Sequence, residues 1–425
     1  MKSIKLTIRK LGPIRNSEIE IMPFMIFSGE SGLGKSYLAI LCHYFFDVMS
    51  SPKRFNALFQ KMNVGMENDK SHLSEEGIAF TLKKTDLEKW FATDVVDYLK
   101  YMLGNATFDA DIMVSLPQSF PKKIPFTCKK GVEIINNQKQ EYWAISVPGV
   151  VYRVGERSVN DEYPYSLLLS FLLLKRILEE RLFKLNTFVL PPSRGPVLTE
   201  QVIPVTGLYT SFDKCITWLK RVPYQQTEIN HEFCALMEDI LEGDVSYDGE
   251  RFMYNRHTTA IPLSAAAASI RELAILSMIA ERTDLANMVV LFEEPEAHLH
   301  PAKQRAMADA LSLMNTFGTY IQVTTHSDYL LRRLNELIKL QKIRERLNDE
   351  NEYEKICKTI GINPFFSFDY NRMGAYLLER NMDGGSRIIK QSLEDGVPFS
   401  SFHNAIENSL SLDEKLTNIL DGENN

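Results

Sequence analysis

Residues 29–36 read Gly29-Glu30-Ser31-Gly32-Leu33-Gly34-Lys35-Ser36 and fit the phosphate-binding pattern G-x-x-x-x-G-K-[ST] at every required position. The apolar run Met25-Ile26-Phe27 precedes this loop and is short enough for a buried strand. Residues 37–41 follow it without a helix breaker. This order of strand, loop and helix is the context in which such a loop holds a nucleotide. The alternative is a glycine-rich turn that matches the pattern by chance.

The residue types of the loop explain its chemistry. Glycines let backbone N–H groups curl around phosphate oxygens without Cβ clashes, and the start of the following helix favours negative charge. Lys35 is expected to reach the β and γ phosphates, and Ser36 to give its hydroxyl to Mg²⁺. The whole stretch from Gly29 to Ser36 is therefore assigned to nucleotide binding.

Acidic residues follow a second apolar run. Residues 288–292 are apolar and rich in β-branched side chains, which predicts a central parallel strand, and Glu293 and Glu294 come directly after it. Phosphate-binding sheets place Mg²⁺ chemistry at the carboxyl ends of such strands. We therefore expect Glu293 to hold Mg²⁺ through water and Glu294 to orient or deprotonate the attacking water. The alternative is a pair of exposed carboxylates in a turn.

A histidine follows the next predicted strand in the same manner. Residues 320–324 form that strand, and His326 lies just beyond it. A histidine in this position can hydrogen-bond a γ-phosphate, so His326 joins Lys35 and Glu294 as a predicted catalytic residue. The alternative is a loop histidine whose hydrogen bonds serve only the structure.

Composition limits the class of protein. The chain has 425 residues, of which 44% are hydrophobic, enough for one large domain with an insertion or for two domains. The longest apolar stretch, residues 167–174, is too short to span a membrane, and no targeting signal is visible at the N-terminus. The cytoplasm is therefore the expected location. The five cysteines are scattered and are expected to be reduced thiols in packed positions.

Charge leaves nucleic-acid binding open. The formal net charge of -7 does not favour nonspecific binding to nucleic acid. Residues 329–347, however, alternate leucines and isoleucines with lysines and arginines, as in an amphipathic helix. A solvated helix face is the simpler interpretation, and nucleic acid stays a possible partner.

The predicted elements divide the chain into four parts. Alternating residues before the loop predict a hairpin, helical spacing appears at 86–103 and 165–183, and short strand-like pieces occupy 110–154. Residues 200–250 are mostly helical in pattern, and the strand and loop pattern resumes afterwards. The two halves of one head are predicted at residues 1–48 and 255–330, with an insertion between them at 49–254. A C-terminal extension is predicted at 331–425.

Three stretches together carry a family resemblance. The sequence Glu294-Pro295-Glu296-Ala297-His298-Leu299-His300-Pro301, residues 324–327 and the phosphate loop resemble the ABC-type ATPases of the OLD and SMC-like group, which are stand-alone ATPases of the AAA family. Residues 11–14 also match, and residues 190–194 look like a short motif that often sits inside the insertion of this group. The resemblance covers about residues 1–45 and 255–330.

The resemblance implies how the nucleotide is held. Two copies are expected to sandwich two ATP molecules with Mg²⁺, each nucleotide held by one copy's phosphate loop and by the signature helix of the other. The signature segment matches residues 262–273, with Ser264 and Ser269 as the expected contacts. The serine and glycine usual before this helix are replaced, which implies slow turnover. His298 and His300 are expected to shape the dimer loop rather than to bind zinc.

The resemblance also implies a fold and a role. The fold is an α/β ABC-type P-loop ATPase head with a mixed sheet, split by a large α+β insertion and followed by a helical C-terminal extension. The C-terminal part lacks the paired acidic motif of a Toprim nuclease, so any effector is expected to be a separate protein. This design is similar to the ATPase subunits of bacterial anti-phage defence systems such as PARIS. Two alternatives stay open: an SMC-like DNA repair ATPase, and a scaffold that binds ATP with little turnover.

Overall fold

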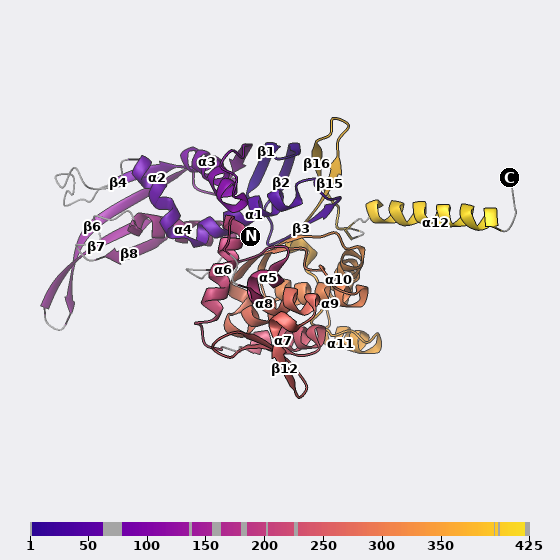
Figure 1. Cartoon of the computed structure of the whole chain (residues 1–425). Helices are drawn as coiled ribbons and strands as arrows, with labels where there is room; N and C mark the ends of the chain where they lie inside the picture. Colours follow the sequence, from indigo (N-terminus) through magenta and orange to yellow (C-terminus); the bar gives the residue numbers. More distant parts are fainter. Residues whose placement is uncertain are drawn as a thin grey trace.

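A mixed sheet forms the centre of the molecule. The computed structural model describes residues 2–62, 79–135, 138–154, 163–179, 185–200, 203–224, 228–394, 396–397 and 400–420. Within these residues, nine strands pair in the order β5-β1-β2-β16-β15-β3-β14-β13-β9, of which Figure 1 labels β1, β2, β16, β15 and β3. In this order they are β5 (Ala110–Ser115), β1 (Lys5–Leu11), β2 (Ile14–Glu20), β16 (Ser386–Lys390), β15 (Met373–Arg380), β3 (Phe24–Gly29), β14 (Tyr320–Thr324), β13 (Met288–Glu293) and β9 (Asn186–Leu190). The large mixed sheet of the predicted ATPase head is confirmed.

Parallel pairing brings three chain segments to one edge. Strand β14 lies between β3 and β13 and is parallel to both, with Ile26 opposite Val323 and Phe292 also opposite Val323. The phosphate loop follows β3, the acidic pair lies at the end of β13 and His326 follows β14. Because parallel strands end at the same edge of a sheet, these segments meet. The prediction of a central parallel strand at 288–292 is confirmed.

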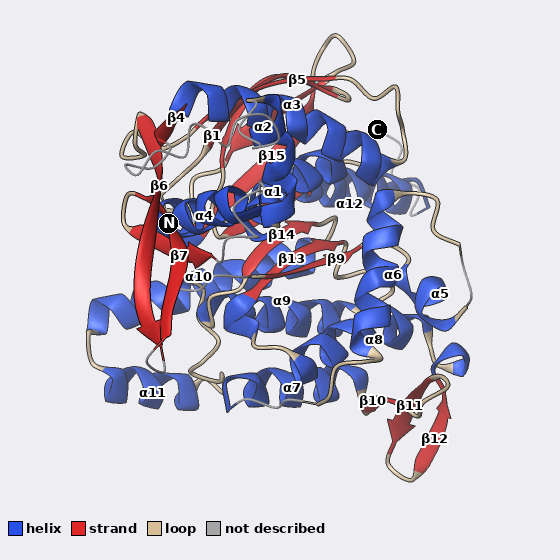
Figure 2. Ribbon diagram, turned by 90° about the vertical axis from the view of Figure 1, so that its left-hand side faces the viewer, coloured by secondary structure: helices blue, strands red, loops and turns tan. Residues whose placement is uncertain are grey.

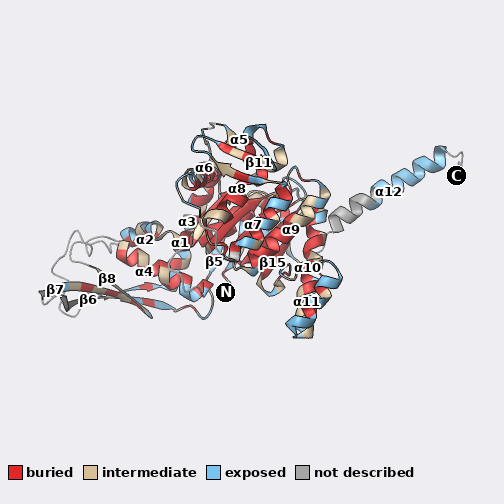
Figure 3. Cartoon of the chain, turned by 90° about the horizontal axis from the view of Figure 1, so that it is seen from below, coloured by how far each residue is buried: buried red, intermediate tan, exposed pale blue. Residues whose placement is uncertain are grey.

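Helices cover both faces of the sheet (Figure 2). The helices of the described part of the chain are α1 (Lys35–Ser50), α2 (Asn56–Lys61), α3 (Lys84–Leu103), α4 (Tyr163–Leu173), α5 (Arg194–Thr199), α6 (Gly207–Leu219), α7 (Glu228–Leu241), α8 (Ala268–Arg282), α9 (Pro301–Thr316), α10 (Asp328–Leu347), α11 (Glu350–Thr359) and α12 (Ser400–Leu420), the last of which extends away from the sheet in Figure 1. Successive side chains of β13 alternate between the two faces, so Val289 and Leu291 pack with α1, and Val290 and Phe292 pack with α8 and α9. Figure 3 shows this buried centre. A strand buried on both faces explains the continuous apolar run.

Two smaller sheets accompany the central one: the first lies within the predicted insertion, and the second crosses its predicted end at residue 254. Strands β4 (Ala79–Lys83), β6 (Lys123–Ile135), β7 (Gln138–Val147) and β8 (Val150–Val154) form one, which projects to one side of the head in Figure 1. Strands β10 (Asp244–Tyr247), β11 (Phe252–Arg256) and β12 (Thr259–Pro262) form the other. The helix expected over 165–183 is α4, which continues as a π-helical segment at Leu174–Leu178, and residues 180–184 lie outside the described part.

The sheet extends beyond the predicted limits of the head. Strands β5 and β9 come from the predicted insertion, and β15 and β16 come from the predicted C-terminal extension. Strand β15 runs parallel beside β3, so the strand that leads into the phosphate loop is covered on both edges. The end of the chain nevertheless contributes helices α10, α11 and α12.

The basic residues of α10 are largely engaged within the chain. Arg333 pairs with Asp309 at 2.8 Å and with Glu336 at 2.8 Å, and Arg344 pairs with Glu350. The described cysteines, Cys42, Cys215, Cys234 and Cys357, are free and buried, as expected for packed thiols. No helix in the described part of the chain combines the length and the apolar character needed to cross a membrane.

The close packing of β15 against Gly29 leaves no room for a side chain at this position. This residue has a φ of +128°, and an added Cβ would clash with the carbonyl oxygen of Leu378 in β15. Gly29→Ala is therefore expected to lower the free energy of unfolding by about 1–3 kcal/mol. Gly318→Ala is the matched control, because Gly318 has a φ of +96° but open space around its Cβ position. Urea denaturation should show the larger loss for Gly29→Ala, and equal losses would contradict the steric explanation.

Candidate functional site

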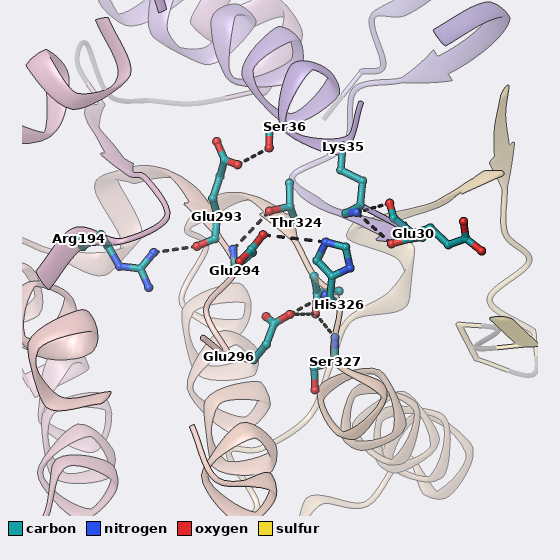
Figure 4. A network of polar contacts seen from close by, with 12 residues as sticks. Glu30, Lys35, Ser36, Arg194, Glu293, Glu294, Glu296, Thr324, His326 and Ser327 are labelled. Atoms are coloured by element: carbon teal, nitrogen blue, oxygen red, sulfur yellow. Dashed lines mark hydrogen bonds and ion pairs between the residues drawn. The ribbon is translucent and has the colours of Figure 1, made fainter. Parts of the chain in front are cut away.

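A cavity at the carboxyl edge of the sheet collects the predicted residues. It has a volume of about 310 Å³ and is lined by Ser31, Gly32, Gly34, Lys35, Ser36, Tyr37, Glu294, Thr324 and His326. The phosphate loop supplies one wall, and the ends of β13 and β14 supply the other (Figure 4). Residues separated by about three hundred positions in the chain thus meet at one site through the strand order.

Lys35 is held by the loop that precedes it. Its Nζ donates hydrogen bonds to the carbonyl oxygens of Gly29 at 2.9 Å and Glu30 at 2.8 Å. Burial lowers the pKa of Lys35 to about 8, against the opposing effect of Glu294 and other nearby carboxylates. A cation surrounded by carbonyl oxygens in a buried loop suits an anionic ligand, which can replace these contacts with stronger charge-assisted ones.

Ser36 and Glu293 form a site that fits a divalent cation. The Ser36 hydroxyl donates a short hydrogen bond to Oε2 of Glu293 across the gap between the loop and β13. Oε1 of Glu293 is buried and has no hydrogen-bond partner among the described residues. Burial is the main cause that raises the pKa of Glu293. A hydroxyl beside a buried carboxylate with an unpartnered oxygen is a donor set that Mg²⁺ would satisfy.

Glu294 faces the cavity in an uncommon backbone conformation. Its φ is 46°, in the left-handed region, and its N–H donates to the carbonyl oxygen of Thr324 at 3.1 Å. The side chain is 42% exposed, and its Oε1 lies 3.9 Å from Nε2 of His326. Glu294 is therefore the accessible carboxylate of the acidic pair, whereas Glu293 is the buried one.

The surroundings of His326 favour its neutral form. Burial first, and the charge of Lys35 second, lower its pKa from the ordinary value of 6.5. A neutral imidazole carries one N–H donor and one acceptor, so His326 can donate to a phosphate oxygen near Glu294.

Glu296 supports the histidine loop, a role that sequence reasoning missed. Its buried Oε1 accepts hydrogen bonds from the Thr325 hydroxyl at 2.8 Å and from the His326 N–H at 2.5 Å. The sequence signal was present in Glu294-Pro295-Glu296, but a local pattern does not show that Glu296 turns towards another strand. Glu296 thus fixes the main chain at His326.

Removing this acceptor should destabilise the protein. In Glu296→Ala, two donors lose their partner, which is expected to cost about 1–3 kcal/mol for each donor left buried. Glu296→Gln keeps an acceptor oxygen of the same shape and is expected to cost clearly less. Thermal or urea unfolding of the two variants checks this order, and an equal loss in both would contradict the role of the hydrogen bonds.

Ser264 and Ser269 lie away from the cavity that contains Lys35. Ser269 is in the first turn of α8 and lines another cavity, of about 520 Å³, together with His298 and His300. Ser264 lines a third cavity, of about 600 Å³. The α8 N-cap is Ala267, which offers no side-chain cap. Within one copy of the chain, Ser264 and Ser269 therefore do not line the cavity that contains Lys35.

The two histidines near α9 do not form a metal cluster. His300 accepts a hydrogen bond from Ala302 N–H at 3.4 Å and so caps α9, while His298 has a φ of 62°. No group of three or more His, Cys, Asp or Glu side chains suitable for a metal ion occurs in the described ranges.

Comparisons with known proteins agree with a nucleotide site. The family model described as "AAA ATPase domain" matches residues 205–331, which include Glu293, Glu294 and His326 but not the phosphate loop. The sequence has no match among curated proteins. Together with the geometry of the cavity, the family match indicates that this chain is a nucleotide-binding ATPase.

Solved structures similar to the chain include heads of SMC proteins. An SMC head bound to the C-winged helix domain of ScpA has 11% identity and a TM-score of 0.39, with 92% of this chain and 98% of that chain covered. The SMC head domain from Thermotoga maritima has 10% identity and a TM-score of 0.33, with 92% and 100% covered. An SMC head from Pyrococcus furiosus, bound to the C-terminal domain of ScpA, has 11% identity and a TM-score of 0.35, with 98% and 100% covered. Because these identities and TM-scores are low, the function of this chain is inferred from the residues of its site and not from these structures.

Proposed function

We propose that two copies of this chain pair through their heads around Mg-ATP and use ATP binding or slow hydrolysis to assemble or switch a larger complex. The proposal is supported by the finding that the predicted nucleotide contacts do not all line the same cavity of one copy. Lys35, Ser36, Glu294 and His326 line one cavity, whereas Ser264 and Ser269 lie outside it. A second copy would bring the N-terminal end of its α8 to the same nucleotide.

The residues of the cavity divide the chemistry between them. Lys35 and the loop N–H groups would hold the phosphates, and Ser36 and Glu293 would hold Mg²⁺, which neutralises charge on the phosphate oxygens. Glu294 is placed to accept a proton from the attacking water because its carboxylate is accessible. His326, whose Nε2 lies 3.9 Å from Oε1 of Glu294, would donate a hydrogen bond to the γ-phosphate.

Two inactive variants should complement each other if the site is shared. Lys35→Ala removes the phosphate contact of one copy, and Ser269→Arg fills the α8 end that would approach the partner's nucleotide. A mixed pair retains one site with a normal phosphate loop and a normal α8 end. Turnover in the mixture is expected to exceed the sum of the separate variants. No recovery, in a mixture shown to contain mixed pairs, would contradict a shared site.

Magnesium dependence tests the role of Ser36. Ser36→Ala removes the hydroxyl beside Glu293, and loss of such a charge-assisted contact costs about 1.5–3 kcal/mol. The Mg²⁺ concentration for half-maximal turnover is therefore expected to rise roughly 10–100-fold. Ser31→Ala, on the same loop, serves as the control. Identical Mg²⁺ titrations for Ser36→Ala and the wild type would contradict the assignment.

We further propose that the chain is the ATPase subunit of a bacterial anti-phage defence system whose effector is a separate nuclease of the Toprim type. This role is supported by the motif resemblance alone. Proteins that copurify with the ATP-loaded chain test it directly, because a nuclease among them would favour this role.

An SMC-like DNA repair ATPase is the alternative function. Such a protein would use long paired helices in the insertion, whereas the described part of the insertion contains a four-stranded sheet and helices of at most 20 residues. Titration with duplex DNA at several salt concentrations separates the two roles, since a steep salt slope would favour DNA binding.

A further inference from the structure

Arg194 is a completely buried arginine at the start of α5, behind the acidic pair. Its guanidinium lies over the ring of Phe292 at 4.9 Å, and its Nη1 donates to the carbonyl oxygens of Pro191 at 2.8 Å and Glu293 at 2.7 Å. Figure 4 shows the contact with Glu293 from the side opposite Ser36. One side chain thus joins the end of β9 to the end of β13.

The same arginine is tied to the signature helix. Its Nε donates to the carbonyl oxygen of Glu272 at 3.0 Å, and its main-chain N–H donates to the Glu272 carboxylate at 2.8 Å. The next N–H, of Gly195, donates to the other carboxylate oxygen at 3.1 Å. Glu272 is on α8, three residues after Ser269. Arg194 and Glu272 therefore form a buried link between α8 and β13.

The link reaches the peptide bond that places Glu294. A trans peptide points its C=O and N–H in opposite directions. Here the Glu293 carbonyl accepts from Arg194, and the Glu294 N–H on the other side donates to Thr324. This peptide leads into the left-handed conformation of Glu294, which costs free energy and persists only where surrounding contacts enforce it.

We propose that Arg194 is a positioning residue that couples the signature helix α8 to the orientation of Glu294 in the same copy. This inference rests on the proposed function, in which the end of α8 contacts the nucleotide of the partner copy. Occupation of the partner's site would then be transmitted through Glu272 and Arg194 to the peptide that aims Glu294. ATP hydrolysis at the two sites of a pair would be cooperative for this reason.

The test compares Arg194→Lys with Arg333→Lys. Lysine keeps the positive charge but cannot reproduce the several directional contacts of the guanidinium. Arg333 is a matched control, because it is also buried and ion-paired but joins α9 to α10. For Arg194→Lys we expect kcat to fall about tenfold and the cooperativity in ATP to be lost. The affinity for ATP should stay within about threefold, and Arg333→Lys should keep both properties.

Amide hydrogen exchange gives a second readout that does not need turnover. In Arg194→Lys, peptides covering 291–297 and 268–275 are both expected to exchange at least about fivefold faster than in Arg333→Lys. Glu272→Gln keeps the shape of its side chain and should show the same pair of changes, which covers the case that Arg194→Lys does not fold. Unchanged exchange at 291–297 in the folded variants would overturn the coupling. A wild type that does not bind Mg-ATP would instead contradict the proposed function, while exchange would still decide the coupling.

Discussion

Glu294→Gln is expected to reduce ATP turnover by about 10²–10⁴-fold without weakening ATP binding. The amide keeps the size of the carboxylate, but it cannot accept the proton of the attacking water. The Glu294 side chain is accessible in the cavity, and the buried Glu293 already accepts from Ser36, so no neighbouring carboxylate stands in the same position. Phosphate release measures turnover, and a fluorescent ATP analogue measures binding.

The matched control for this variant is Glu379→Gln. Glu379 also lies at the end of a strand of the central sheet, but it pairs with Arg387 at 3.1 Å, away from the cavity. Its variant should keep wild-type turnover. A wild type that hydrolyses ATP no faster than Glu294→Gln would show that the chain binds ATP without useful hydrolysis.

Lys35→Met is expected to weaken ATP binding roughly 10–100-fold, since a charge-assisted contact to phosphate contributes about 1.5–3 kcal/mol. Lys35 is buried, and methionine fills most of the same space while removing the ammonium. Folding should therefore be preserved, because no buried cation has to be compensated in the variant. The rise in melting temperature on adding Mg-ATP, measured against concentration, reports the affinity.

Lys53→Met provides the control for charge, because Lys53 is exposed. It should keep the wild-type response to Mg-ATP. A Lys35→Met protein that is stabilised by ATP as strongly as the wild type would contradict the assignment of the cavity as the phosphate site.

Local sequence patterns predicted the parts of the fold that lead into the site. The strands β3, β13 and β14 are buried on both faces, so β3 and β13 each begin with an uninterrupted apolar run, and in β14 Gln322 breaks a similar run. That pattern is sufficient to place the phosphate loop, the acidic pair and His326 at strand ends. The helix expected at 86–103 is also present, as α3.

Long-range pairing accounts for what the patterns did not predict. Strand β15 contains an apolar run similar to that of β13, but its place beside β3 depends on residues about 350 positions earlier in the chain. The same applies to Arg194 and Glu296, whose side chains contact other elements. A buried arginine among carboxylates is visible only once the strands are assembled, because its sequence neighbours do not identify its partners.

The molar mass of Glu294→Gln with and without Mg-ATP tests the shared site most directly. Light scattering should show a doubling when saturating Mg-ATP is added, because the variant binds ATP but cannot hydrolyse it. Lys35→Met, measured in parallel, should stay at its starting mass. A Glu294→Gln protein that binds ATP yet keeps the same mass with and without it would contradict the account.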